Sequence, residues 1–543
     1  MKKSLLSIFG VFAATAFMAQ TPSSSWTISQ NAGFSNVSAG IRFMDAVSPN
    51  DVWVVGYDGT APSANYNWFS KTNNGGTTWT TGNIFADTMS YVIANLEGIN
   101  ATTAWVAAYN YSLQAQGGIF ETTNGGTTWT NMTPAGMFTN TASFADIVCF
   151  LTPSVGIVIG DPNGTGNEFE IWRTTNGGTT WSLVPGANIP NPSSTAEYGL
   201  VNVYAKQGTT NMWFGTNKGR IYRTTDAGVT WNVTTLPTLP VASAGVNDIA
   251  FSDAMNGVAY VFNTSTTPAT FQMCNTIDGG ATWNNITTIS PNVGKNDLNV
   301  VPGTNMFVSV GAGSTNTVIS YSSNNGVTWT SWGSIGIQYL TIDFANATSG
   351  WAGSFSDPAN AATGGIWKYN GPAITSVVNA GFNAPSVACP STAITVTNTS
   401  SGATSYTWSI APSGSINTPT SLNPTITVGA QGNYTITLIA SNSSTTSTTT
   451  KLVNVNCVGI AQNGSVASSM MVYPNPAKET LNVEVATSDV YTVSLSNLLG
   501  KVIFADKSAK DKTTINLSNV AAGVYFLTVD IKGEKTTKKI IVE

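Results

Sequence analysis

The side chains that could perform acid–base chemistry in this chain are few and unevenly spread. Its 543 residues include no histidine, which removes the usual general base, the Ser-His-Asp triad and imidazole metal ligands. The arginines are Arg42, Arg173, Arg220 and Arg223. Aspartates recur in short apolar runs at Asp45, Asp146, Asp248 and Asp343. Two carboxylates around a central opening could hydrolyse a glycoside, but recurrence along the chain favours a structural role, such as bonding backbone between repeats.

One loop has the spacing of a calcium site. Asp161, Asn163 and Thr165 alternate like the oxygen ligands of an EF-hand-like loop, and Glu168 follows. The twelfth position, which should hold a bidentate glutamate, is Trp172. We therefore expect no metal and no cofactor, and keep Ca²⁺ in this loop as the alternative to a glycine-rich hairpin.

Composition and the N-terminus indicate an exported protein. Hydrophobic residues make up 42% of the chain and charged residues only 9%, and the net charge of −5 gives no basic surface for nucleic acid. Lys2 and Lys3, an apolar run over residues 5–12 and small residues at 14–16 predict a cleaved signal peptide over residues 1–19. A short membrane anchor is the alternative, but the run is too short for a comfortable span, and we expect no membrane span in the mature chain.

A ten-residue motif, repeated about every 50 residues, must supply the elements that position any site. Its copies are KTNNGGTTWT (71–80), ETTNGGTTWT (121–130), RTTNGGTTWS (173–182), RTTDAGVTWN (223–232), NTIDGGATWN (275–284) and YSSNNGVTWT (321–330). Each copy shares an Asn or Asp, a Gly two residues later and a closing Trp. These residues are Asn74, Gly76, Trp79; Asn124, Gly126, Trp129; Asn176, Gly178, Trp181; Asp226, Gly228, Trp231; Asp278, Gly280, Trp283; and Asn324, Gly326, Trp329.

The motif predicts a hairpin in an all-β fold. Asn-Gly-Gly and Asp-Gly favour tight turns because Gly accepts positive φ and Asn or Asp bonds nearby backbone. The Trp would fill the gap between neighbouring sheets. Short β-rich runs such as 51–56 and 117–123 surround the turns, and no segment has a helical period. Four short strands per period are typical of a propeller blade.

The motif resembles the Asp-box, or BNR, repeat of sialidases, sortilin-type receptors, some xyloglucanases and photosystem II assembly factors. In those families the box is a peripheral hairpin between the third and fourth strands of a blade, so the resemblance implies a structural role. Sialidases of this class need three arginines and a tyrosine nucleophile in the central funnel, and Arg173 and Arg223 instead lie beside boxes. Xyloglucanase-like enzymes pair carboxylates across two propellers, and this chain has room for one.

The ends of the repeated region predict the blade count. Residues 339–370 supply three strands and no box, and residues 23–29 look like a lone fourth strand with Trp26 in place of the box Trp. Joining them gives a seven-bladed β-propeller over residues 23–371, closed by both ends of the domain. A six-bladed ring with spare terminal strands is the alternative.

Two small antiparallel β-sandwiches are expected after the propeller. Residues 374–457 resemble a PKD-type, Ig-like domain, with Trp408 in the core facing the strand that carries Tyr434, although the family's usual GDG turn is missing. Cys389 and Cys457 bracket it, and export permits a disulfide between them; two free thiols are the alternative. Cys149 and Cys274 fall on different blades and are expected to be buried thiols.

Residues 458–471 form a polar linker, and residues 472–543 resemble the type A C-terminal sorting domain of the type IX secretion system. The matching residues are Tyr473, Pro474, Asn475, Pro476, Gly500, Lys501, Gly523, Val524, Tyr525, Lys538 and Lys539. The resemblance implies a Bacteroidetes-type bacterium, Sec export to the periplasm, the type IX machinery as partner, translocation across the outer membrane and removal of the tail.

Together these features predict an exported cell-surface or secreted protein that is not an enzyme. Its propeller would bind a glycan or a protein in adhesion or nutrient capture. The alternative is a glycoside hydrolase of Asp-box type, either sialidase-like or xyloglucanase-like.

Overall fold

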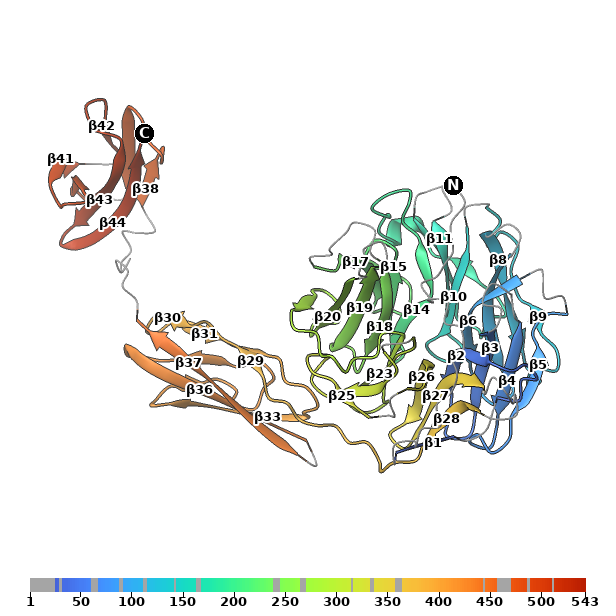
Figure 1. Cartoon of the computed structure of the whole chain (residues 1–543). Coiled ribbons are helices and arrows are strands. Elements are labelled where there is room, and N and C mark those ends of the chain that lie inside the picture. The colour runs from blue at the N-terminus through green and yellow to red at the C-terminus, as the bar shows by residue number, and fades with distance from the viewer. Residues whose placement is uncertain are drawn as a thin grey trace. The chain divides into compact units, whose positions relative to one another are not determined.

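The computed structural model of the chain is drawn in Figure 1. It describes residues 25–28, 32–59, 67–86, 91–110, 115–140, 143–162, 168–237, 245–263, 270–313, 316–332, 336–356, 364–442, 445–456, 470–485, 489–509 and 512–543. The predicted signal peptide and residues 458–469 of the predicted linker lie outside these ranges. The chain divides into two compact units, one of residues 1–386, 393–427 and 434–453, the other of residues 387–392, 428–433 and 454–543.

The described residues form strands, with a single 3-10 turn, η1 (Gly186–Asn188), as the only helical element among them. Within these ranges, no helix has both the length and the apolar character needed to cross a membrane. The all-β fold class expected from the sequence is therefore observed.

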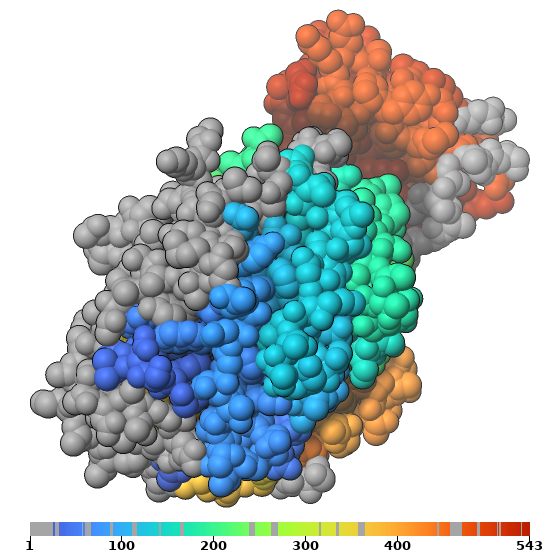
Figure 2. All heavy atoms as spheres, turned by 90° about the vertical axis from the view of Figure 1, so that its right-hand side faces the viewer, coloured from blue at the N-terminus to red at the C-terminus, as the bar shows by residue number. Residues whose placement is uncertain are grey.

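The first unit contains five four-stranded antiparallel sheets whose strands follow chain order. Their strands are β6 (Tyr91–Gly98), β7 (Ala104–Asn110), β8 (Ala115–Thr122), β9 (Thr130–Asn131); β10 (Ala145–Phe150), β11 (Gly156–Pro162), β12 (Phe169–Thr174), β13 (Ser182–Leu183); β14 (Gly199–Gln207), β15 (Asn211–Thr216), β16 (Arg220–Thr224), β17 (Asn232–Thr235); β18 (Val246–Phe251), β19 (Gly257–Asn263), β20 (Thr270–Thr276), β21 (Asn284–Ile286); and β22 (Asp297–Val300), β23 (Phe307–Val310), β24 (Ile319–Ser322), β25 (Thr330–Ser331). On the face drawn in Figure 2, successive sheets lie side by side in chain order, from blue through turquoise to green.

Two further four-strand runs belong to one larger sheet, joined where Gly40 pairs with Phe355. One run is β2 (Ala39–Ala46), β3 (Val52–Asp58), β4 (Trp68–Thr72) and β5 (Thr80–Asn83). The other is β26 (Tyr339–Asn346), β27 (Ser349–Ser356), β28 (Gly364–Tyr369) and β1 (Trp26–Ile28). The pairing expected for the N-terminal strand is present, since Trp26 lies opposite Tyr369 and Ile28 opposite Trp367.

The first strands of successive sheets contact one another and close a ring. β2, β6, β10, β14, β18, β22 and β26 touch in this order, and β26 touches β2. The strands near the centre are buried on both faces, as in β10, where every residue is buried. The outermost strands β9, β13 and β25 are short and exposed. This gradient explains why the inner strands read as apolar runs and the outer ones as Thr, Ser and Asn.

Residues 374–456 form three smaller sheets. Their strands are β29 (Phe382–Asn383), β30 (Val387–Ala388), β31 (Ala393–Thr395), β32 (Thr397–Asn398), β33 (Ser405–Ala411), β34 (Ser415–Ile416), β35 (Thr425–Thr427), β36 (Gly432–Ser441) and β37 (Thr446–Val455). The sheet orders are β29-β32, β30-β37-β36-β33 and β31-β35-β34. Trp408 is buried on β33, which pairs with β36, the strand that carries Tyr434. Its indole N–H donates to Ser421 O at 3.0 Å.

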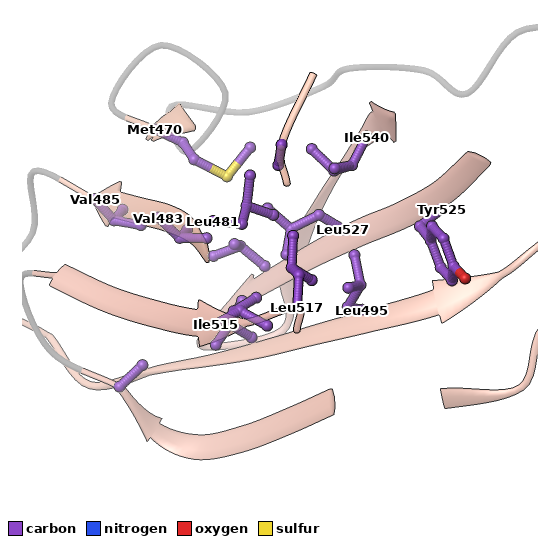
Figure 3. Packing of buried hydrophobic residues seen from close by; sticks show 14 of the residues in the cluster. Met470, Leu481, Val483, Val485, Leu495, Ile515, Leu517, Tyr525, Leu527 and Ile540 are labelled. Atoms are coloured by element: carbon purple, nitrogen blue, oxygen red, sulfur yellow. The ribbon is translucent and has the colours of Figure 1, made fainter. Parts of the chain in front are cut away.

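The C-terminal residues form two sheets around one core. The first is β38 (Met470–Tyr473), β39 (Thr480–Val485) and β42 (Lys512–Asn516), and the second is β41 (Val502–Ala509), β40 (Tyr491–Asn497), β43 (Gly523–Ile531) and β44 (Glu534–Val542). Both sheets send apolar side chains into this core, including Leu481, Leu495 and Leu527 (Figure 3). A segment of this size with its own buried core has what it needs to fold as a separate domain.

Candidate functional site

The six boxes adopt one turn whose polar groups bond to each other. In each box the N–H of the shared Gly donates to a Thr or Ser hydroxyl four residues earlier, at 2.8–3.0 Å. That hydroxyl donates to the Oδ1 of the Asn or Asp, at 2.8–3.1 Å. The same Oδ1 accepts the N–H of the Thr before the Trp, at 2.9–3.0 Å. These groups are thus used within the turn.

Asn and Asp are equivalent in this turn because the facing threonine hydroxyl reverses its role. Asn176 Nδ2 donates to Thr180 Oγ1 at 2.9 Å, whereas Thr230 Oγ1 donates to Asp226 Oδ2 at 2.6 Å. Partial burial raises the pKa of Asp226, but the hydrogen bonds it accepts outweigh burial and hold that pKa below its ordinary value. The pKa of Asp278 is lowered in the same way.

The closing Trp of a box packs against aromatic side chains of its own and the preceding sheet. Trp181 meets Trp105 and Phe150 edge-on, each with ring centroids 6.0 Å apart. The shared Gly makes this approach feasible, since a Cβ on Gly178 would lie 2.4 Å from the Trp105 ring. Trp181 therefore joins neighbouring sheets.

A second link between sheets starts one residue before the box Thr at three boxes, and at Lys368 of β28. Arg173 Nε donates to Ala227 O at 2.7 Å, and Asn275 Nδ2 donates to Asn325 O at 3.0 Å, each acceptor lying in the following box. Arg223 reaches Gly279 O at 3.3 Å, and Lys368 donates to Gly75 O. We call these contacts the outer clamps.

The arginines do not assemble the triad of a sialidase-like funnel. Arg173 and Arg223 serve as outer clamps, and Arg220 is paired with the buried carboxylate of Glu197 at 2.7 Å. Arg42 lies with its guanidinium 4.8 Å from the Phe43 ring. None of the four lines the central cavity.

The central cavity lies inside the ring of first strands and has a volume of about 520 Å³. Residues from β2, β6, β10, β14, β18, β22 and β26 line it. Three of the four aspartates singled out in the sequence, Asp45, Asp248 and Asp343, lie in its wall, together with Asp297. Asp146 is buried and does not line the cavity.

The wall aspartates hold neighbouring strands together. Asp45 Oδ2 accepts the N–H of Gly98 at 2.6 Å, and Asp343 Oδ2 accepts the N–H of Ala46 at 2.6 Å. The following sheets repeat this contact. Asp248 accepts from Leu298 at 2.7 Å, Asp297 from Ile342 at 2.7 Å, and Glu97 from Phe150 at 2.9 Å. Each bond crosses from one first strand to the next.

β14 departs from this pattern. Here Lys206 donates to Glu97 and to Phe150 O, and Gln207 donates to Phe251 O. The side chains of this strand therefore donate hydrogen bonds to neighbouring first strands, where the carboxylates of the other strands accept them. The Lys206 side chain is 39% exposed, into the cavity that it lines. The register of β14 shifts between Gly199 and Tyr204. No sequence signal marked these residues, because none repeats in the other sheets.

Asn202 lies in this irregular stretch with a φ of 58°, a conformation rare for residues other than glycine. It lines the cavity, and its side chain makes no hydrogen bond to another described residue. Backbone held in such a conformation next to a cavity is characteristic of functional sites. β14 is therefore the best candidate ligand-contacting strand.

Burial shifts the pKa values of the titratable groups of the cavity. Burial raises the pKa of Asp45 to about 6; the Glu97 carboxylate adds to the rise, and Lys206 opposes it. Burial and neighbouring carboxyl groups also raise the pKa values of Asp248 and Asp343. Burial and Glu97 raise the pKa of Tyr204, whose hydroxyl donates to Glu97 at 2.9 Å. Tyr204 is thus held protonated and is not activated as a nucleophile.

The remaining predicted sites divide between described and undescribed residues. Asn163 and Thr165 of the calcium alternative lie outside the described residues, while Asp161 accepts the N–H of Gly199 at 2.8 Å. No group of three metal-ligating side chains occurs in the ranges the structure describes. Cys149 and Cys274 are free and buried, as expected. Cys389 is disulfide-bonded; Cys457 lies outside the described residues, so its pairing stays a prediction.

The sorting motifs bond to the last strand of the C-terminal domain. Asn475 Nδ2 donates to Lys539 O and Asn475 Oδ1 accepts the N–H of Ile541, both at 2.9 Å. Lys538 Nζ donates to Met470 O at 2.9 Å, and Tyr525 OH donates to Ala521 O at 2.7 Å. The sequence motifs therefore hold this small fold together.

The family match and the match to a curated relative each cover a small part of this chain. Residues 471–543 match the family described as a secretion system C-terminal sorting domain. An endo-acting ulvan lyase of Formosa agariphila is 32% identical over 95 residues, which are 17% of this chain and 18% of the lyase. The chain thus matches less than a fifth of that relative's length.

Three solved structures similar to this chain each cover roughly two thirds of it. YCF48 bound to D1 peptide is 15% identical, with a TM-score of 0.43, over 66% of this chain and 98% of that one. The BP39L lectin from Burkholderia pseudomallei is 12% identical (TM-score 0.38; 62% and 99% covered). A PL25 ulvan lyase is 9% identical (TM-score 0.36; 63% and 95% covered).

The family match agrees with the bonding of the tail. Its boundary, residue 471, differs by one residue from the boundary expected from the sequence. The domain that it identifies interacts with the type IX secretion machinery. Residues 471–543 are therefore a C-terminal sorting domain, and the protein is secreted or held at the cell surface.

Proposed function

We propose that this protein is a non-catalytic glycan-binding protein whose ligand enters the central cavity beside β14. The cavity volume of 520 Å³ carries the proposal. It falls within the roughly 300–1,000 Å³ of small-ligand sites. A protein partner would instead need a surface of about 800 Å² on each side. The ligand is therefore a glycan end or short segment.

The fold proposed for this function is a seven-bladed β-propeller. The support is the ring of first strands and the closure of the last run by β1. We also propose that the boxes are Asp-box turns with a structural role and that residues 374–457 are a PKD-like sandwich. Neither would contact the ligand.

The chemistry of the cavity wall suits a sugar. Asn202 offers an amide with both donor and acceptor groups, and Lys206 and Gln207 add donors. Met44, Tyr204 and Val300 line the same cavity, are partly exposed and give apolar surface for the carbon face of a sugar ring. A few convergent polar groups on an apolar wall are typical of a small-ligand site.

Two features favour binding over catalysis. The carboxylates of the wall accept backbone N–H groups of neighbouring strands, which ties them to the ring. Tyr204, the cavity-lining tyrosine that donates to the Glu97 carboxylate, has a raised pKa and so stays protonated. A sialidase-like mechanism would require the opposite.

A glycoside hydrolase is the second candidate, favoured by one observation. Asp248 and Asp297 lie close enough to raise the pKa of Asp248, and both line the cavity. A carboxylic acid with a raised pKa beside a second carboxylate is the arrangement of a glycosidase. The matched lyase also acts, by its name, on a polysaccharide.

The test is a glycan array probed with the purified full chain. Asn202→Gly keeps the left-handed backbone conformation and removes the amide, so binding should fall about tenfold, the loss of one good hydrogen bond. Lys532→Gly is the matched control, because Lys532 also has a positive φ, 51°, but lies in the sorting domain. Absence of binding to every glycan by folded protein would contradict the proposal.

The same glycans decide between binder and enzyme. Each bound glycan is incubated with the full chain and its products are separated by chromatography. Unchanged glycan supports the binder. Cleavage that Asp297→Asn abolishes while binding persists would establish the hydrolase instead.

A further inference from the structure

The sorting domain exposes an apolar surface at one end of its larger sheet. Leu498 is 68% exposed and Leu499 is 93% exposed, at the turn between β40 and β41. Val502 and Ile503, the first residues of β41, are 55% and 40% exposed. We call these four residues the apolar tip. Contiguous exposed apolar side chains of this kind mark interaction sites.

The turn that carries the apolar tip is firmly built. Asn497 Oδ1 accepts the N–H groups of Leu499 and Lys501, both at 3.0 Å. The Asn497 N–H donates to Lys501 O at 3.0 Å, and Gly500 supplies the required positive φ of 81°. The leucines are therefore held outward by a specific turn, not left exposed by a frayed end.

The two edge strands of the same sheet differ in whether another segment of the chain covers them. At β44, Ala477 donates to Ile541 O at 2.8 Å and accepts from Glu543 at 2.9 Å, so the segment after the Tyr-Pro-Asn-Pro motif covers that edge. β41 pairs only with β40 among the described strands. Natural proteins usually protect such an edge, because its free N–H and C=O groups invite another strand.

We propose that the apolar tip and the open edge of β41 form the surface by which the sorting domain docks on the type IX secretion machinery. The occupant is an extended apolar segment of a machinery component, which adds a strand to β41 and covers the leucines. The partner class follows from the sorting family of residues 471–543. The proposal is independent of the ligand of the propeller.

The sequence motifs do not offer an equal surface. Asn475 and Lys538 use their polar groups inside the domain. Tyr473 donates to Glu484, and its hydroxyl accepts from Lys512 at 3.0 Å. These groups build the fold, while the apolar tip has no such structural use.

The test uses the full chain in a bacterium with a type IX system. Leu498→Ser/Leu499→Ser should lower the surface-exposed fraction at least about tenfold, as the loss of two apolar anchors predicts, with the chain retained in the periplasm. Met471→Ser is the matched control, since Met471 is 61% exposed on the same domain. Protease resistance of the retained chain reports that the tail is folded.

A second measurement decides the case even when a variant folds poorly. A photo-crosslinking residue replaces Leu499 in the otherwise unchanged chain, and a second chain carries it at Met471. Crosslinking from position 499 alone to a type IX component, identified by mass spectrometry, supports the proposal. Undiminished secretion of the double variant, or crosslinking of position 499 only to a second copy of this chain, would overturn it.

Discussion

The box turns and the cavity wall of the first unit use the same side-chain type in opposite ways. Asp226 sits in an exposed turn, where accepted hydrogen bonds hold its pKa low. Asp248 and Asp343 sit in the wall of the cavity, where burial raises their pKa values. An aspartate of the outer turn is bonded within its own repeat, and an aspartate of the wall is bonded to the next repeat.

This difference explains which positions repeat. The polar groups of a box bond to one another within the same turn, so every copy needs the same residues at the same spacing. A wall residue needs only some N–H group on the neighbouring strand, and its position shifts with the local register. Asp45 and Asp343 lie opposite Trp53 and Trp351. Asp248 lies opposite Tyr260, directly after the register shift of its strand, whereas Asp45 and Asp343 lie two residues further beyond the shifts of theirs.

The largest effect on stability is expected from removing the side chain of a box Trp. Trp181→Ala should lower the free energy of unfolding by about 3–5 kcal/mol, the usual cost of removing a buried aromatic side chain. Trp181 is 8% exposed and joins two sheets. Guanidinium denaturation measures the change. Leu183→Ala, at a residue 52% exposed in the same sheet, is the control and should change stability little.

The outer turns and the aspartates of the cavity wall could be predicted from the sequence, whereas the side chains of β14 could not. The hairpin position of Gly178 and the packing of Trp181 followed from a motif whose partners lie within a few residues or in the next copy. Asn202 and Lys206 carry no such signal, because β14 has its own register shift and its own donors. The contact of Lys206 with Glu97 spans 109 residues and depends on ring closure.

The pH dependence of stability should separate the two sets of aspartates. Asp45 has a pKa of about 6 in the folded chain against an ordinary 3.8, so between these values the folded state binds more protons. Its contribution is therefore present at acidic pH and lost as pH rises through about 6, on the order of 3 kcal/mol. The lowered pKa of Asp226 acts oppositely, since its contribution is lost as pH falls through the folded pKa.

Asp45→Asn tests the wall contribution. The Asn amide oxygen still accepts the N–H of Gly98, but it does not titrate. The loss of stability between about pH 4 and pH 7 should therefore become smaller in this variant, as measured by denaturation at a series of pH values. An unchanged pH profile would show that Asp45 titrates normally in the folded chain.

A smaller effect is expected at the polar centre of a box. Asp226→Asn should change stability by less than about 0.5 kcal/mol, because Asn176 makes the same turn. Asp226→Ala leaves the N–H of Thr230 and the hydroxyl of Thr224 without their acceptor and should cost about 1–2 kcal/mol. Equal costs for the two variants at neutral pH would contradict the interchange of Asn and Asp.

The smallest effect concerns the outer clamp that is missing. Glu121 occupies the position before its box at which Arg173 and Asn275 supply donors in their own sheets, but an ionised carboxylate can only accept hydrogen bonds. Burial raises the pKa of Glu121, and its carboxylate has no hydrogen bond to another described residue. Glu121→Gln supplies an amide donor, as Asn275 does, and should stabilise the chain by about 1 kcal/mol, the net value of one hydrogen bond. Glu121→Met removes the partly buried charge without adding a donor, so it measures the effect of losing the charge apart from the effect of adding a hydrogen bond.

A guanidinium midpoint at pH 7 that is higher for Gln than for Met would show that the sheets are joined by these donors. Equal midpoints would mean that only the charge matters, and that the outer clamps of the other sheets contribute little to the ring.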